Sequence, residues 1–199
     1  MSNLYYASAY KNKIINLLLK NKNFIKLINP TPSKCEDLDI IDVLIGGEWI
    51  IDGKKVEEKG HIFDYDFTTV DETTNESRTF VFVETDIPTI TDDLFMDFNL
   101  YICIFSRKDL VRLTSESKPT VKEVKDMGYF AGSTGNRIDI LCDVVDRILN
   151  GNEKIQGIGT LKPAPRGFLT NYSPHKNYYG KCLKYHITNL SELEDICGD

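Results

Sequence analysis

NRIDILCDVVDRILN, residues 136–150, predicts the clearest helix in the sequence, and the fold class follows from it. Its apolar residues recur at helical spacing and form one continuous stripe, which must cover the face of a sheet. Asn136 is a typical N-cap, and Asn150-Gly151 predicts the end of the helix. The stripe consists of Ile138, Leu141, Cys142, Val145, Ile148 and Leu149.

The segments before this helix predict the sheet. FNLYICIF, residues 98–105, is apolar enough for the centre of a sheet, and Asp52-Gly53 predicts a hairpin turn after Trp49. A polar loop at residues 70–77 predicts a second hairpin between the strands on either side of it. Together the segments favour one antiparallel sheet. The extended segments are residues 40–45, 61–67, 79–83 and 98–105.

The ends of the chain complete an α+β class, in which an N-terminal helix and the central amphipathic helix pack on an antiparallel or mixed sheet with long loops. A helix over residues 5–19 continues to residue 28 and stops at Asn29-Pro30-Thr31-Pro32. Strands follow near 157–162 and over 178–188, separated by an irregular stretch. We expect one domain over residues 1–190 and a mobile acidic tail over 191–199. Within the domain we expect a helical unit at 5–28, a mainly β region at 39–113, the helix at 136–150 and C-terminal strands at 157–188.

Charge is distributed in blocks along the 199 residues, whose net charge is −6. Residues 1–34 carry six lysines and no acid, and residues 35–99 carry 18 acidic and four basic residues. Residues 100–185 carry 14 basic and eight acidic residues, and residues 186–199 carry four acids and no base. This balance argues against a dedicated nucleic-acid binder. The sequence also has no apolar run long enough to span a bilayer and no signal region at its start, so we expect synthesis in the cytoplasm.

The five cysteines contain no CxxC pair, which argues against zinc and redox sites. We expect them to be reduced, packed thiols, as is usual in a reducing cytoplasm. They are Cys35, Cys103, Cys142, Cys182 and Cys197.

Several candidate catalytic groups do not combine into a site. Strand alternation points His61 away from Asp64 and Asp66, so we expect an exposed acidic face and no metal site there. Adding Glu84 and Asp86 gives four carboxylates of the kind that a two-metal nuclease uses, and this metal-dependent nuclease or other phosphate-handling enzyme is the alternative function.

The loop Gly132-Ser-Thr-Gly135-Asn-Arg137 can place phosphate at a helix start, but it lacks the P-loop lysine and spacing, so an N-cap is favoured. His175 and His186 have no partner by spacing, and surface or interface roles are expected for them. We therefore expect no catalytic residue, no cofactor and no metal.

Self-assembly is the interpretation that we favour. The basic helical unit of one copy can contact the acidic segment of the next head to tail, which closes a ring when the rotation permits. Trp49 is expected to be a packing anchor, and it joins the lysines as a candidate interface residue. The candidate interface residues are Lys11, Lys13, Lys20, Lys22, Lys26 and Trp49.

The chain resembles tail terminator and head-tail connector (neck) proteins of tailed bacteriophages. The resemblance covers about residues 5–188 and rests on the order of elements and on the local sequence of four stretches. These stretches are residues 10–19, 98–105, 135–151 and 178–186.

The resemblance implies a non-enzymatic virion subunit that forms a ring, commonly a hexamer, and joins the tail tube to the neck. Its partners would be copies of itself and other neck and tail-tube proteins, without a membrane. DNA would pass through the lumen without sequence-specific binding. Negative charge in the lumen repels phosphates, so part of the acidic segment at residues 35–99, or the tail after Ser191, would line it. Glu192, Glu194 and Asp195 are the candidate lumen-facing residues.

Overall fold

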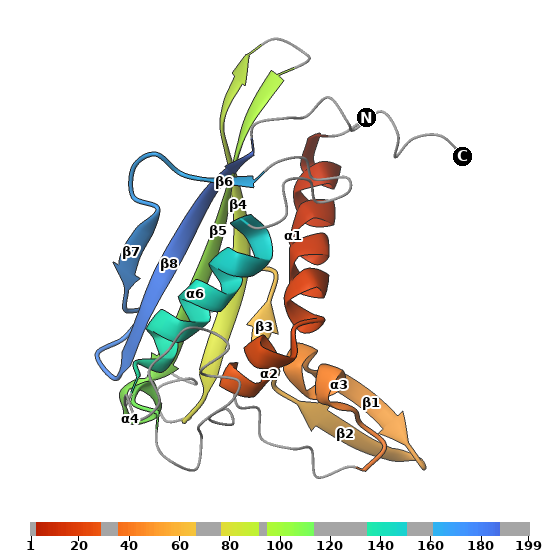
Figure 1. Ribbon diagram of the computed structural model, residues 1–199. Coiled ribbons are helices and arrows are strands. Elements are labelled where there is room, and N and C mark those ends of the chain that lie inside the picture. The colour runs from red at the N-terminus through yellow and green to blue at the C-terminus, as the bar shows by residue number, and fades with distance from the viewer. Residues whose placement is uncertain are drawn as a thin grey trace.

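The computed structural model describes residues 3–28, 36–66, 77–91, 95–113, 135–150 and 161–187. It confirms the predicted α+β class: helices pack on one face of a six-stranded mixed sheet, and a two-stranded hairpin stands apart from that sheet (Figure 1). In chain order the elements are α1 (Asn3–Leu19), α2 (Lys22–Ile28), α3 (Ile40–Ile45), β1 (Gly47–Ile51), β2 (Lys54–Glu58), β3 (Ile62–Phe63), β4 (Thr79–Thr91), β5 (Phe95–Arg107), α4 (Lys108–Val111), α6 (Arg137–Asn150), β6 (Leu161–Pro163), β7 (Leu169–Tyr172) and β8 (Tyr178–Ile187).

The large sheet has the strand order β3-β4-β5-β8-β6, and β7 pairs with β8 beside β6. β5 lies between β4 and β8 and is antiparallel to both, which confirms the central position predicted for residues 98–105. β7 corrects the prediction that residues 163–177 are irregular throughout. Its four residues pair with residues 180–183 of β8, so a short edge strand interrupts that stretch.

The pairing of β3 with β4 is parallel, so the predicted hairpin between residues 61–67 and 79–83 is wrong. The strand itself is also shorter than predicted, because only Ile62 and Phe63 join the ladder. The His61 amide donates to the Leu44 carbonyl, and the Val81 amide donates to the His61 carbonyl. These bonds tie the segment to α3 on one side and to β4 on the other.

Residues 40–45 form the helix α3, which corrects the predicted extended segment. Asp39 is its N-cap: one carboxylate oxygen accepts from the amides of Ile41 and Asp42 at 2.7 and 3.0 Å. The Asp42 carboxylate accepts in return from the Asp39 amide at 3.2 Å, which completes a capping box. This local bonding overrides the strand preference of the β-branched residues in the segment.

The hairpin β1–β2 turns at Asp52-Gly53, as predicted. Both turn residues have positive φ angles, 50° and 72°, as the tight hairpin turn that matches strand twist requires. The hairpin forms its own two-stranded sheet and extends away from the body in Figure 1. The expectation of a single antiparallel sheet is therefore wrong for these two strands.

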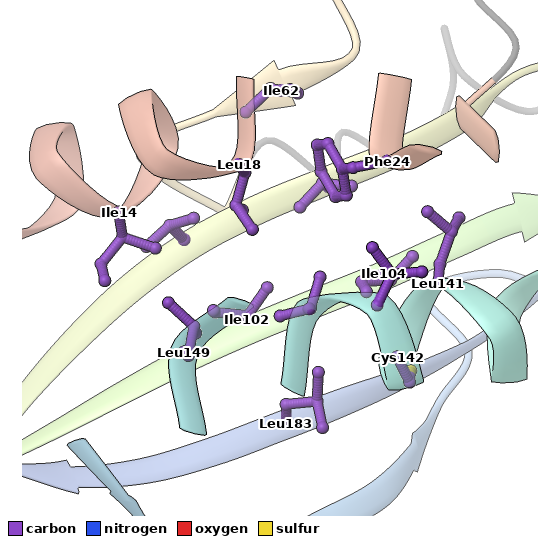
Figure 2. Close-up of a cluster of buried hydrophobic side chains, with 14 of the residues drawn as sticks. Ile14, Leu18, Phe24, Ile62, Ile102, Ile104, Leu141, Cys142, Leu149 and Leu183 are labelled. Atoms are coloured by element: carbon purple, nitrogen blue, oxygen red, sulfur yellow. The ribbon is translucent and has the colours of Figure 1, made fainter. Parts of the chain in front are cut away.

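The main core lies between the helices and the large sheet. Figure 2 shows Leu18 from α1, Phe24 from α2 and Leu141 from α6 directed toward Ile102 and Ile104 of β5. Five of the six residues of the predicted apolar stripe are buried in this core, and the sixth, Ile148, is partly buried against it. The core also contains Ile140 and Val144, which lie outside the predicted stripe. The central helix therefore covers the sheet as its periodicity predicted.

The opposite face of the sheet holds a second, aromatic cluster. The Tyr172 ring of β7 lies 5.5 Å from the Phe82 ring of β4 and 5.7 Å from the Phe105 ring of β5, so the sheet curls around this face. At Gly180 a side chain would overlap the Cβ of Phe105, which is why β8 can approach β5 so closely there. The buried members of the cluster are Phe80, Phe82, Cys103, Phe105, Tyr178 and Cys182.

Cys103 and Cys182 form a disulfide within this cluster, which corrects the prediction of reduced thiols for these two residues. They lie directly opposite each other on β5 and β8, with their Cα atoms 4.0 Å apart. Cys142 is a free, buried thiol, as predicted. Cys35 and Cys197 lie outside the described residues.

Candidate functional site

The predicted interface lysines lie on the helical unit α1–α2, and they differ in exposure. Lys20, Lys22 and Lys26 are exposed, whereas Lys11 and Lys13 are half-buried. The Lys11 ammonium group donates to the Glu84 carboxylate at 3.1 Å and to the Asp64 carbonyl at 2.6 Å. Lys11 is therefore paired within its own chain. The exposed positive charge of the helical unit lies at the α1–α2 junction and along α2.

A groove of about 390 Å³ lies beside this junction, between the end of α1, the start of α2 and α6. We call it the basic groove. Leu17, Val144 and Ile148 supply its apolar part, and Lys20 and Arg147 supply its positive charge. Arg147 also pairs with Asp143 one helical turn earlier, at 2.8 Å, on the exposed side of α6. The other two lining residues are Asn21 and Asn23.

The four carboxylates of the alternative enzyme prediction are not assembled into a metal site. Asp64 and Asp66 are exposed after the short strand β3, and Glu84 bonds to Lys11. Across the described residues, no group of three or more His, Cys, Asp and Glu side chains is placed to hold a metal ion.

The three histidines have separate surroundings. His61 is buried, and its Nδ1 lies 2.8 Å from the Thr79 carbonyl; because a carbonyl only accepts, Nδ1 carries the proton. His175 Nδ1 accepts from the Asn177 amide at 3.3 Å, and His186 Nδ1 lies 3.4 Å from the Asn99 side-chain oxygen.

The start of α6 is an N-cap, as predicted. The Asn136 side-chain oxygen accepts from the Ile138 amide at 2.9 Å and from the Asp139 amide at 3.4 Å. Arg137 points into the protein and donates to the carbonyls of Leu110 and Leu27 at 2.9 and 2.5 Å. Burial lowers the pKa of this guanidinium below its ordinary value. Arg137 is therefore a structural group that joins α6 to the ends of α4 and α2. Residues 132–134 of the candidate phosphate loop lie outside the described residues.

The hairpin β1–β2 carries exposed apolar surface. Ile50 is 82% exposed, and Trp49 is half-buried against its own hairpin, where its ring lies next to Gly47. A cleft of about 700 Å³ opens at the base of the hairpin and is lined in part by Ile15, Ile45 and Tyr65. Ile45 and Tyr65 are themselves 49% and 54% exposed.

A second hairpin extends from the other end of the body. Among the described residues, β5 and β8 pair as far as Phe98 with Ile187, and the outer parts of β4 and β5 continue past that pair. Beyond that point β4 and β5 pair with each other, as in Thr89 with Asp97 and Thr91 with Phe95. Figure 1 shows this arm at the opposite end of the molecule from β1–β2. We call residues 86–91 and 95–97 the β4–β5 arm.

A family model described as YomW matches residues 12–187. The chain belongs to the YomW family. The family carries a phage-derived gene name, which indicates a phage-associated protein. This agrees with the resemblance to bacteriophage proteins at that general level. No curated protein and no solved structure matches the chain significantly. No helix within the described part of this YomW protein is long and apolar enough to cross a membrane.

The lysines of this YomW chain were predictable from its sequence, but the groove and the arm were not. The groove needs α1, α2 and α6 side by side, which no local pattern reports. The sequence did indicate the extra length of β4 and β5, because apolar and β-branched residues continue through residues 86–97. The candidate lumen residues Glu192, Glu194 and Asp195 lie outside the described residues.

Proposed function

We propose that this YomW protein is a non-enzymatic structural subunit of a phage particle. In this proposal, copies of the chain assemble into a ring, with six subunits as the expected number, at the tail terminator or neck position. The ring joins the tail tube to the head-tail interface, contacts other neck and tail-tube proteins, and lets DNA pass through its lumen. The protein is made in the host cytoplasm and resides in the virion.

The observation that carries the assembly proposal is the pair of hairpins that extend from opposite ends of the body. An isolated two-stranded hairpin is marginally stable in water, and exposed apolar residues on it gain from being covered. Ile50, at 82% exposed, and the half-buried Trp49 lie on one of these hairpins. A neighbouring subunit supplies such cover in a ring.

The blocked charge supports the same proposal. The exposed lysines of α1–α2 belong to a segment without acids, and the next 65 residues carry a large acidic excess. Opposite charge on different parts of one chain favours contacts between unlike surfaces, which is the heterologous geometry of rings.

The test is the mass of the purified full chain across a wide concentration range, measured by sedimentation with and without magnesium, together with electron microscopy. We expect a closed oligomer, or a mass that rises with concentration, and no dependence on magnesium. A monomer at every concentration would contradict the proposal. Specific magnesium binding that is lost in Asp64→Asn and Glu84→Gln variants would favour the enzyme alternative.

A further inference from the structure

The last residues of β8 line a pocket with basic side chains. It has a volume of about 370 Å³, and Arg166, Lys184 and His186 supply its polar lining together with Asn99. We call it the β8 pocket. Asn99 is 7% exposed, and its side-chain oxygen lies 3.4 Å from His186 Nδ1. Among the described residues, its amide nitrogen has no acceptor, so it is left to donate to an occupant. The other lining residues are Ala164 and Pro165.

The positive charge of the β8 pocket is not neutralised within the described part of the chain, where no carboxylate pairs with Arg166 or Lys184. Arg166 is exposed, and the Lys184 ammonium group lies 5.2 Å from the centre of the Tyr101 ring. A guanidinium group matches the two oxygens of a carboxylate or a phosphate, and a nearby ammonium group adds to the attraction. The pocket is therefore suited to an anionic occupant.

Negative charge gathers at the opposite edge of the same sheet. The segment at residues 64–66, Asp-Tyr-Asp, follows the short strand β3 and is exposed. Lys11 fixes it beside β4, because the Lys11 ammonium group donates to the Asp64 carbonyl at 2.6 Å and to the Glu84 carboxylate at 3.1 Å. Two strand residues further on, Asp86 is also exposed. We call these four acids the acidic edge: Asp64, Asp66, Glu84 and Asp86.

The acidic edge and the β8 pocket lie at the same height of the sheet, on opposite sides of β5 (Figure 1). Residues that pair across strands point to the same face, and two such rows cross β4, β5 and β8 here. The rows are Glu84–Tyr101–Lys184 and Asp86–Asn99–His186. One face of the sheet therefore runs from acidic at β4 to basic at β8.

The segment at residues 64–66 cannot enter the pocket of its own chain. β3 and β6 are the outer strands of the order β3-β4-β5-β8-β6, so they lie about 19 Å apart at about 4.8 Å per strand pair. A second copy, in contrast, can bring its acidic edge against the β8 pocket. DNA phosphate is the poorer match, because the chain has a net charge of −6 and the acids of β4 lie on the same face as the pocket.

We infer that the acidic segment at residues 64–66 of one copy binds the β8 pocket of the next copy. Asp64 and Asp66 supply the carboxylates, and Arg166 and Lys184 supply the positive charge that receives them. The contact joins two different edges of the sheet head to tail, so it propagates around a ring. This inference rests on the proposed function, because it names the contact that builds the assembly.

The test reverses the charge of each side of the contact in the full chain and then of both sides. The pocket variant carries Arg166→Glu and Lys184→Glu, and the edge variant carries Asp64→Lys and Asp66→Lys. Each is expected to raise the concentration needed for half-assembly, measured by sedimentation, at least about tenfold. The chain with all four substitutions is expected to regain most of the lost assembly, since its edge and pocket attract again.

Two control variants change charge by the same amount elsewhere on the surface. Lys108→Glu with Lys176→Glu matches the pocket variant, and Glu36→Lys with Asp37→Lys matches the edge variant. All four side chains are exposed and lie outside both the acidic edge and the β8 pocket. Both controls should assemble like the parent chain. Circular dichroism of every variant verifies that the fold is retained.

The outcomes separate this contact from assembly itself. Assembly that neither reversal weakens overturns the contact and leaves the ring proposal standing. Loss in the pocket variant alone, or no recovery in the fourfold variant, also overturns it, because the pocket then takes another anion. If that variant also loses binding of labelled double-stranded DNA, the other anion is phosphate. A parent chain that stops at a dimer overturns the head-to-tail geometry, and one that stays monomeric overturns the inference together with the proposed function.

Discussion

Arg137 illustrates how much a single buried residue determines in this fold. Its side chain is 1% exposed, and its donors satisfy the carbonyls of Leu27, in the last turn of α2, and Leu110, in α4. Helix ends leave such carbonyls without partners inside the helix, and a guanidinium can bond two of them at once. One residue at the start of α6 therefore holds three helices together.

Replacing Arg137 with Met should lower the free energy of unfolding by about 2–4 kcal/mol, because one buried and one partly buried carbonyl lose a charged donor. The same substitution at Arg147 is the matched control. Arg147 lies on the same helix, but it is exposed and pairs with Asp143 at the surface, so a change below about 0.5 kcal/mol is expected. Urea unfolding measures both values, provided that the unfolding free energy depends on urea concentration with the same slope in each variant. Equal losses in the two variants would show that Arg137 has no special structural role.

The Cys103–Cys182 pair shows why residue-level prediction failed here. The two cysteines are 79 positions apart, and only the register of β5 against β8 brings them together. Neither the spacing of the cysteines nor their apolar neighbours carries that register, so packed thiols were the natural expectation.

The purified, unreduced chain should therefore contain three or fewer free thiols after unfolding, and five after reduction. Because the disulfide closes a long loop, the double variant Cys103→Ala, Cys182→Ala should lose roughly 2–4 kcal/mol of stability. Adding a reductant should weaken the parent chain in the same way and leave the double variant unchanged. Five free thiols in the unreduced chain would contradict the disulfide.

Among the secondary-structure elements, long segments with a strong periodicity were predicted correctly, whereas short segments were not. The helix at 136–150 and the strand at 98–105 were predictable because many residues repeat one pattern. Residues 40–45 are a single apolar run that suits either a strand or a helix, and the bonds of Asp39 decide in favour of the helix. The parallel partner of β4 was not predictable, since pairing between distant segments depends on the whole sheet.

The helix α6 and the strand β8 were each predicted from the sequence, but the side-chain contacts between them were not. Asp139 on α6 accepts from the Lys181 ammonium group at 2.6 Å, and Asp146 accepts from the Tyr185 hydroxyl at 2.9 Å. Cys142 lies on the same helix and is buried. Burial raises the pKa of the Cys142 thiol from 9.0 to about 12, and burial also raises that of Tyr185.

Stability should therefore fall as the pH rises from about 9 toward 12. Above pH 9 the unfolded chain loses the Cys142 proton while the folded chain keeps it, so ionisation favours unfolding. A pKa difference of about 3 corresponds to at most about 4 kcal/mol across this range. Urea unfolding at several pH values measures the slope. Cys142→Ala should start from a lower stability but lose less of it with pH, and an unchanged slope in this variant would contradict the assignment.

At the scale of the whole molecule, charge blocks predicted the kind of surface but not its shape. The excess of lysine in residues 1–34 was visible in the sequence, whereas the groove depends on how α1, α2 and α6 pack. The acidic segment was visible too, but its residues are distributed over the hairpin β1–β2, the region of β3 and the β4–β5 arm.

The acidic end of the chain gives the last prediction, which tests the proposed ring. Negative charge along a channel repels DNA phosphates, so a ring that DNA crosses benefits from weak binding. Neutralising Glu192, Glu194 and Asp195 as amides should tighten binding of double-stranded DNA by the assembled protein at least about tenfold at low salt. The gain should disappear as salt screens the charges.

Fluorescence anisotropy of labelled DNA, measured against salt concentration, makes this comparison directly. The matched control neutralises Glu36, Asp37 and Asp52, three exposed acids on another part of the chain. If the tail lines the lumen, the tail variant gains affinity and the control changes little, because only the lumen charges meet the DNA. Equal gains in both variants would mean that net charge alone governs binding. No gain in the tail variant would remove Glu192, Glu194 and Asp195 from the lumen and leave the ring proposal standing, since the ring does not depend on these residues.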